Sequence, residues 1–192
     1  MTLFLSRLVP ALLCALLAAC SLAPPARENS TVYYDLSAAN AESGGALRSL
    51  DVVPSSWLAG TAMHYRLAYA DANRREHYAG SRWSGQPAEL LSMHLQRSLM
   101  SGSNGPGAGC RLRLDLDDFT QVFDSAQSSR MLLEGRATLY GTQQIVLARR
   151  IVSLSQPAGA DAAGGVAASG PLTAALIREL REWIAQECRK PG

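Results

Sequence analysis

The histidines, a serine cluster and a glycine-rich segment could in principle support catalysis in this 192-residue chain. His64, His77 and His94 are dispersed and lack the spacing of a metal-binding motif such as HExxH. The serines between residues 125 and 129 are not set in a nucleophile elbow. The glycines between residues 102 and 109 lack the lysine and the strand-to-helix setting of a phosphate-binding loop. We therefore expect no enzymatic activity, no metal site and no cofactor.

Three aspartates at residues 115, 117 and 118 could act as calcium ligands or general acids. From Arg111 to Asp117 the chain alternates leucine with charged residues, a pattern typical of a strand with one buried and one solvated side. Asp115 and Asp117 then share the outer side with arginines, which favours a solvated face. Asp118 breaks the alternation, and this predicts a β-bulge or bend nearby.

Cys20 offers a different chemistry, because it directly follows Leu17–Ala19 and a short apolar stretch preceded by Arg7. This order of positive charge, apolar run and small residues predicts a secretory signal peptide over residues 1–19. The apolar run is too short to span a bilayer. With the cysteine, the segment resembles a bacterial lipoprotein signal, which implies cleavage before Cys20 and a firm anchor of fatty chains such as palmitate. An ordinary secretory signal with a chance cysteine is the alternative.

Residues 20–30 follow as a lipidated terminus and a flexible tether, which the prolines at 24 and 25 keep extended. Ser21 stands where an aspartate would favour retention at the inner membrane. By resemblance to bacterial lipoproteins we expect the protein at the outer membrane, anchored by lipid and facing the periplasm.

Two cysteines, Cys110 and Cys188, remain in the mature chain besides Cys20. Disulfides persist in such an oxidising compartment. A bridge between them would fix the last helix to the sheet, and two unpaired thiols are the alternative.

The mature chain has the length of one domain, which we place at residues 31–190. The formal net charge of the whole chain is only +2, and this indicates no strongly basic face for nucleic acid.

Strands and helices follow from side-chain periodicity and turn residues. We expect strands at 31–36, 47–53, 63–69, 75–78, 111–117 with an apolar continuation to 123, 131–140 and 145–154, loops at 40–45 and 101–109, a helical turn at 55–58, a helix from Pro87 to Leu99, one or two turns at 161–168 and a final helix from Leu172. Gly170 and Pro171 predict a kink or restart before that final helix. The fold class is α+β, with a mainly antiparallel sheet of six or seven strands and two or more helices packed on one face.

Four ordered segments carry a family resemblance. They are Tyr33–Leu36 soon after the lipidation cysteine, Arg82–Trp83 before a leucine-rich helix, Phe119–Ser125 with Ser128–Arg130 and the strand Leu133–Leu139, and an alanine-rich stretch that leads to a helix with Trp183. Together they resemble the ABC-type transport auxiliary lipoproteins, the PqiC-like family. The family's final helix is usually uninterrupted, so Gly170 and Pro171 depart from its pattern.

The resemblance implies a non-catalytic partner of a lipid-transport system. In such systems an ABC permease and ATPase act with an MCE-domain protein between two membranes. It also implies that a homo-oligomeric ring can form. Our first docking candidates are Phe119, Phe123, Asp124 and Arg130. The alternatives are that both phenylalanines fill the core and that Arg130 pairs with Asp124 across the turn.

Two other functions remain open at this stage. The first is a periplasmic lipid-binding shuttle or acceptor, which needs an apolar cavity of about 300 Å³ or more. The second is a structural envelope lipoprotein without a transporter.

Overall fold

The computed structural model describes residues 30–36, 47–100 and 110–188. The chain divides into two units, Met1–Ser30 and Thr31–Gly192. The described part of the second unit is called the body below. Within the described residues, no helix is both long enough and apolar enough to cross a membrane.

Several expectations fall on parts of the chain outside the described residues. These are the signal peptide at 1–19, the lipidation site Cys20, the tether up to residue 29, and the loops at 40–45 and 101–109. They stay predictions.

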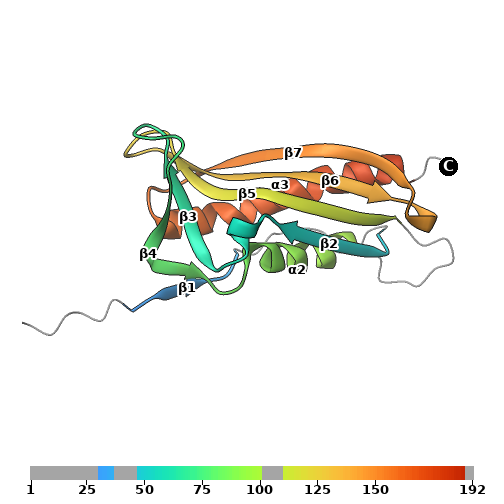
Figure 1. The fold of residues 1–192 in the computed structure, drawn as a ribbon, viewed down its shortest axis with the longest axis horizontal. Coiled ribbons are helices and arrows are strands. Elements are labelled where there is room, and N and C mark those ends of the chain that lie inside the picture. Colours follow the sequence, from blue (N-terminus) through green and yellow to red (C-terminus); the bar gives the residue numbers. More distant parts are fainter. Residues whose placement is uncertain (1–29, 37–46, 101–109, 189–192) are drawn as a thin grey trace, which may run out of the picture. The chain divides into compact units, whose positions relative to one another are not determined.

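The described residues of the body form seven strands and two α-helices (Figure 1). In chain order they are β1 Val32–Tyr34, β2 Ser49–Pro54, β3 Ala62–Leu67, β4 Arg75–Trp83, α2 Pro87–Leu99, β5 Arg111–Phe123, β6 Ser129–Tyr140, β7 Val146–Ala158 and α3 Ala162–Glu187, with short 3₁₀ helices at Ser56–Leu58 and Thr142–Gln144. The expected α+β fold is confirmed.

The sheet is mixed and has the strand order β1-β4-β3-β5-β6-β7, with β2 paired to β5 off this path. The longest pairings, β5 with β6 and β6 with β7, are antiparallel and form the expected meander. Parallel pairings join β1 to β4, β2 to β5 and β3 to β5. One edge of β5 is therefore shared, because β2 pairs with its first half and β3 with its last residues. The local pattern of each strand does not specify this arrangement.

Both helices pack on one face of the sheet, and the core lies between. Helix α2 contacts β2, α3 contacts β6 and β7, and the two helices contact each other. The alternation in β5 buries Leu112, Leu114 and Leu116 completely under the helices. In Figure 1, β5, β6 and β7 pass in front of α3, so the viewer looks onto the other face, called the helix-free face below.

Helix α2 begins as its sequence predicts. Pro87 occupies the first turn, where its missing N–H costs nothing, and Gln86 forms a capping box with Glu89. Its leucines at 91, 95 and 99 are almost completely buried. The i, i+4 spacing therefore identified the packed side of this helix correctly.

The bulge predicted near Asp118 is confirmed. The pairing of β5 with β6 shifts register between Leu116 and Asp118, which leaves Asp117 as the extra residue. Gly135 lies opposite Leu116, and a Cβ on Gly135 would come within 2.4 Å of the backbone oxygen of Asp115. Only glycine fits this close approach of the two strands.

The predicted interruption of the last helix is wrong. Helix α3 runs without a break from Ala162 through Pro171 to Glu187, as the family resemblance implied. Pro171 removes the hydrogen bond to the carbonyl of Ala167 one turn earlier. Both residues are exposed, so water can replace that bond. Leu172 and Leu176, which follow, are buried against the sheet, and their packing keeps the helix continuous past Pro171.

Most strand boundaries differ from the expected ones by one or two residues, and two differ by more. Strand β4 continues to Trp83 rather than ending at Tyr78, and β7 continues to Ala158 rather than residue 154. The end of β7 stays extended because it pairs with the beginning of β6, with Pro157 opposite Arg130. Proline is tolerated there because β7 is an edge strand.

Candidate functional site

Two of the four docking candidates are buried in the core and do not reach the surface. Phe119 is 1% exposed and Phe123 is 7% exposed. The ring of Phe119 lies 5.6 Å from that of Trp83, centroid to centroid, in the core. The bulge explains this burial. Before it the even-numbered residues of β5 face the core, and after it the odd-numbered ones do, so Phe119 enters the core opposite Leu133.

The other two candidates pair with each other. The Nε of Arg130 lies 3.1 Å from the Oδ2 of Asp124, and both side chains are well exposed. This is the pairing across the turn that was the alternative to partner binding. The pair is a surface ion pair of the kind that contributes little to stability.

A closed group of charged and aromatic side chains lies on the helix-free face and bridges β3, β4 and β5. It is called the Asp118 cluster and consists of Trp57, His64, Arg66, Arg75, Asp118 and Thr120. Asp118 is 9% exposed by side chain and accepts two hydrogen bonds from Arg75, each 3.1 Å long. A third bond comes from Arg66 at 3.2 Å, and Thr120 donates a fourth. The carboxylate is fully satisfied by its neighbours.

Aromatic rings cover this cluster. The guanidinium of Arg75 stacks on Trp57 with its carbon 3.5 Å from the ring centroid. His64 meets the same indole edge-on at 5.2 Å between centroids. Burial, and then the positive charge of Arg75, lowers the pKa of His64 below 6.5. The imidazole is therefore held neutral at pH 7, and the bonds of the cluster link β3, β4 and β5.

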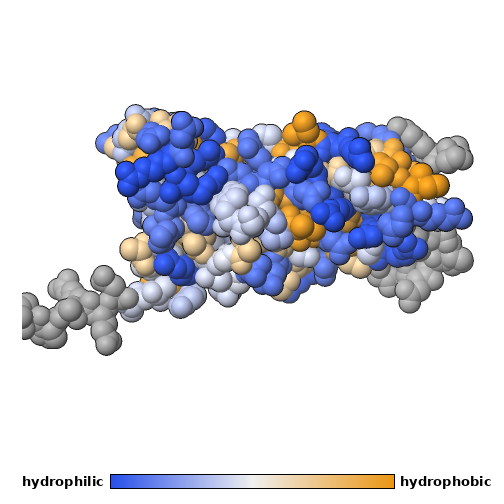
Figure 2. Space-filling model, in the orientation of Figure 1, coloured by the Kyte–Doolittle hydropathy of each residue, from blue (hydrophilic) through white to orange (hydrophobic). Residues whose placement is uncertain are grey.

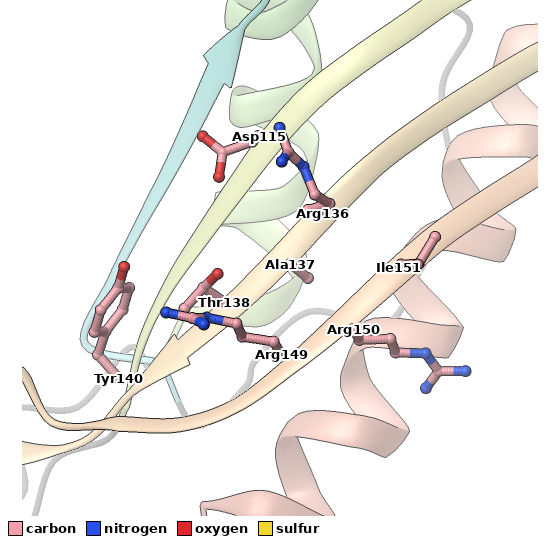
Figure 3. A pocket seen from close by; sticks show the side chains of 8 residues that line it. All are labelled: Asp115, Arg136, Ala137, Thr138, Tyr140, Arg149, Arg150 and Ile151. Atoms are coloured by element: carbon pink, nitrogen blue, oxygen red, sulfur yellow. The ribbon is translucent and has the colours of Figure 1, made fainter.

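An open groove of about 550 Å³ lies farther along the same face, over the first half of β5, the second half of β6 and the first half of β7. It is called the arginine groove, and its lining residues are Asp115, Arg136, Ala137, Thr138, Tyr140, Arg149, Arg150 and Ile151 (Figure 3). Figure 2 shows that this face is mainly hydrophilic, with apolar residues exposed between the polar ones.

Strand register places the side chains of the groove in two rows. Arg113, Thr138 and Arg149 are opposite one another across β5, β6 and β7, and Asp115, Arg136 and Ile151 form the next row. Figure 3 shows Arg136 directed toward Asp115, and Arg149 directed across Thr138 toward Tyr140. Arg150 points the other way, to Glu179 on α3, at 2.7 Å.

Three arginines of this region have an aspartate partner. Arg111 bonds Asp51 at 2.9 Å, Arg113 bonds Asp115 at 2.7 Å, and Arg136 bonds Asp117 at 3.2 Å. The described residues provide no ion pair or hydrogen bond to the guanidinium of Arg149. The groove therefore carries one uncompensated positive charge next to paired ones, and it can bind an anionic group.

The disulfide lies at one end of the body. Cys110, which directly precedes β5, is bridged to Cys188 at the end of α3, with their Cα atoms 6.1 Å apart. The bridge closes a loop of 78 residues, and such a loop corresponds to about 4–5 kcal/mol in the chain-entropy model. The expected pairing fixes the helix to the sheet, as anticipated.

In the described part of the chain, no three His, Cys, Asp or Glu side chains lie close enough together to hold a metal ion. His64 and His77 are neighbours across β3 and β4, and His94 is on α2. Burial, and then nearby Arg97, lowers the pKa of His94.

The arginine groove was not identified from the sequence. One local signal was present. In the predicted strand Arg149 and Ile151 alternate with Val152, so if Val152 is buried, as the structure shows, both of them point outward. Their proximity to Arg136 and Asp115 follows from the register of three strands, which no local pattern shows.

Comparisons with known proteins show the fold. No family model and no curated protein matches the chain. A crystal structure of a Xanthomonas campestris protein, described with the family model DUF330, superposes with a TM-score of 0.66 at 16% identity, over 79% of this chain and 94% of that one. A second crystal structure, of an uncharacterized protein, has a TM-score of 0.64 at 15% identity, over 81% and 99%. At these identities the likeness is one of fold.

Proposed function

We propose that this chain is a lipid-anchored, non-catalytic auxiliary protein of an intermembrane lipid-transport system. Fatty chains on Cys20 hold it at the outer membrane, facing the periplasm. The body binds the transport machinery, which consists of an ABC permease, an ATPase and an MCE-domain protein. ATP is hydrolysed on the ATPase subunit.

The observation that carries the proposal is the order of three features along the chain. The sequence Leu17–Cys20 stands at the end of a signal-like apolar stretch, a short proline-containing segment follows, and the compact body begins near residue 31. The disulfide between Cys110 and Cys188 supports an oxidising compartment. The ordered motifs that resemble the auxiliary lipoproteins supply the transport context.

The character of the groove favours protein binding over carriage of a lipid. A lipid carrier needs a concave apolar site, whereas the arginine groove is open and lined by Asp115, Arg136, Thr138 and Arg149. An adaptor needs only a modest contact, because anchoring on one membrane raises the local concentration of both partners.

The test begins with the amino terminus of the full chain, expressed in its native host with a carboxy-terminal affinity tag. Intact mass should show cleavage before Cys20 and added acyl chains, and the protein should fractionate with the outer membrane. Cys20→Ser should abolish all three. Cys14→Ser is the matched control. Cys14 lies inside the signal peptide and leaves with it, so this substitution should change nothing.

The second step asks for the partner. The tagged, acylated protein should recover the MCE-domain protein of the same host from detergent-solubilised envelopes. An unmodified amino terminus would refute the anchored adaptor altogether. An acylated protein that recovers no MCE-domain protein would refute the transport role and leave a structural envelope lipoprotein.

A further inference from the structure

Strand β7 ends the sheet with a long open edge next to the arginine groove. It pairs with β6 over Val146–Ala158, and no other described strand pairs with its outer side. About half of the N–H and C=O groups of such an edge point away from the sheet. These groups can hydrogen-bond to one more extended segment.

The side chains beside this edge favour a negatively charged partner. Arg149 is exposed and without a partner among the described residues, and Arg136 lies diagonally across from it on β6. Diagonal neighbours of this kind are about 7–8 Å apart, a distance that long side chains bridge easily. A carboxylate placed over β7 can therefore accept hydrogen bonds from Arg149 and feel the charge of Arg136 as well.

An apolar contact lies in the next row. Ile151 is 79% exposed, the highest exposure among the large hydrophobic residues of the described chain. It is two positions after Arg149 on the same strand, so both side chains are on the helix-free face.

We propose that the β7 edge and the arginine groove together bind an acidic extended segment of a partner protein, which adds an eighth strand to the sheet. The proposal deepens the function above and rests on it for the identity of the partner. Backbone hydrogen bonds to β7 supply much of the affinity, and the side chains supply the specificity. In the added strand, the geometry requires an acidic residue opposite Arg149 and an apolar residue two positions away, opposite Ile151.

The edge explains why a protein segment fits better than an anionic lipid. A phosphate headgroup could engage Arg149 and Arg136, but it would leave the backbone groups of β7 and the side chain of Ile151 without a counterpart. Charged residues on an edge strand also discourage pairing with unrelated chains. Arg149 repels basic segments and admits acidic ones, which is how an open edge stays selective.

The test uses random ten-residue peptides displayed on phage, selected against the full acylated chain in detergent micelles. Peptides enriched on the wild type but not on Arg149→Glu should carry an acidic and an apolar residue two positions apart. The dissociation constant of the best synthetic peptide is then measured by fluorescence anisotropy. Arg149→Glu should weaken it about tenfold or more, and Ile151→Thr by about threefold.

Two controls separate this surface from charge in general. Arg178→Glu changes another exposed arginine, on α3 on the other side of the sheet, and should leave binding within about twofold. N-methylation of the alternate peptide residues whose N–H groups point toward β7 removes these donors and should abolish binding. Thermal unfolding confirms that each variant is folded.

Three results would overturn the proposal. They are the absence of any enrichment over Arg149→Glu, binding that survives N-methylation, and binding of phosphatidylglycerol vesicles that depends on Arg149 while no peptide does. The last would assign the groove to a lipid headgroup. None of them bears on acylation of Cys20 or on recovery of the MCE-domain protein, so the two proposals can fail separately.

Discussion

The Asp118 cluster and the arginine groove use the same residue types on the same face of one sheet, yet they differ in how their charges are matched. In the cluster two arginines and a threonine surround one buried aspartate, and an indole covers them. In the groove the charges are exposed, and Arg149 has no partner among the described residues. Matched, covered charges fix strands in place, whereas exposed and unmatched ones are available to a ligand.

The largest expected difference concerns the two aspartates. Asp118→Ala leaves Arg66 and Arg75 with no carboxylate in a site where both are only about a quarter exposed, and should destabilise the fold by about 3 kcal/mol. Asp115→Ala removes a more exposed ion pair and should cost about 0.5 kcal/mol. Urea unfolding of both variants measures the difference. Equal losses would contradict the contrast between the regions.

The second prediction addresses the junction between the regions. Gly135→Ala places a methyl group against the backbone oxygen of Asp115 and forces β5 and β6 apart at the bulge. We expect a loss of about 2 kcal/mol, within the range for overpacking. Hydrogen exchange should rise on both sides of the bulge. Gly80→Ala is the control, because a Cβ there would meet nothing within 4 Å.

A smaller effect is expected from pH. Burial lowers the pKa of His64 in the folded protein below its unfolded value of 6.5, so the unfolded chain binds more protons as the pH falls through that value. The contribution of His64 to stability is complete above pH 6.5 and decreases below it, down to the lowered pKa. His64→Gln should reduce the loss of stability between pH 7 and pH 5, measured by thermal unfolding. An unchanged pH profile would show that the imidazole is not buried in the cluster.

The smallest effect is expected at the groove. Arg149→Ala should change the free energy of unfolding by no more than about 0.5 kcal/mol, because the side chain is exposed and unpaired within the described body. Arg75→Ala, its matched control in the cluster, should cost clearly more. A large loss at Arg149 would mean that the groove is structural.

Much of the fold was predictable because its signals are local. The leucines of β5 and α2 identified their buried sides through periods of two and of about four residues, and the broken phase at Asp118 identified the bulge. The interruption at Gly170 and Pro171 was predicted wrongly, because propensity is weaker than the packing of Leu172 and Leu176 on the sheet. Phe119 and Phe123 failed as docking candidates for a related reason, since a one-residue shift at the bulge decides which way Phe119 points.

The sequence by itself determined most of the strands and helices and which side of most of them is apolar, since each of these depends on neighbours within a few residues. It also predicts the chemistry of the amino terminus. Tertiary structure alone decided where the charges meet. Arg75 and Arg66 reach Asp118 from 43 and 52 residues away, and Arg149 reaches the groove through the register of three strands. Strand order and register are set by the packing of the whole sheet, and no short stretch of sequence encodes them.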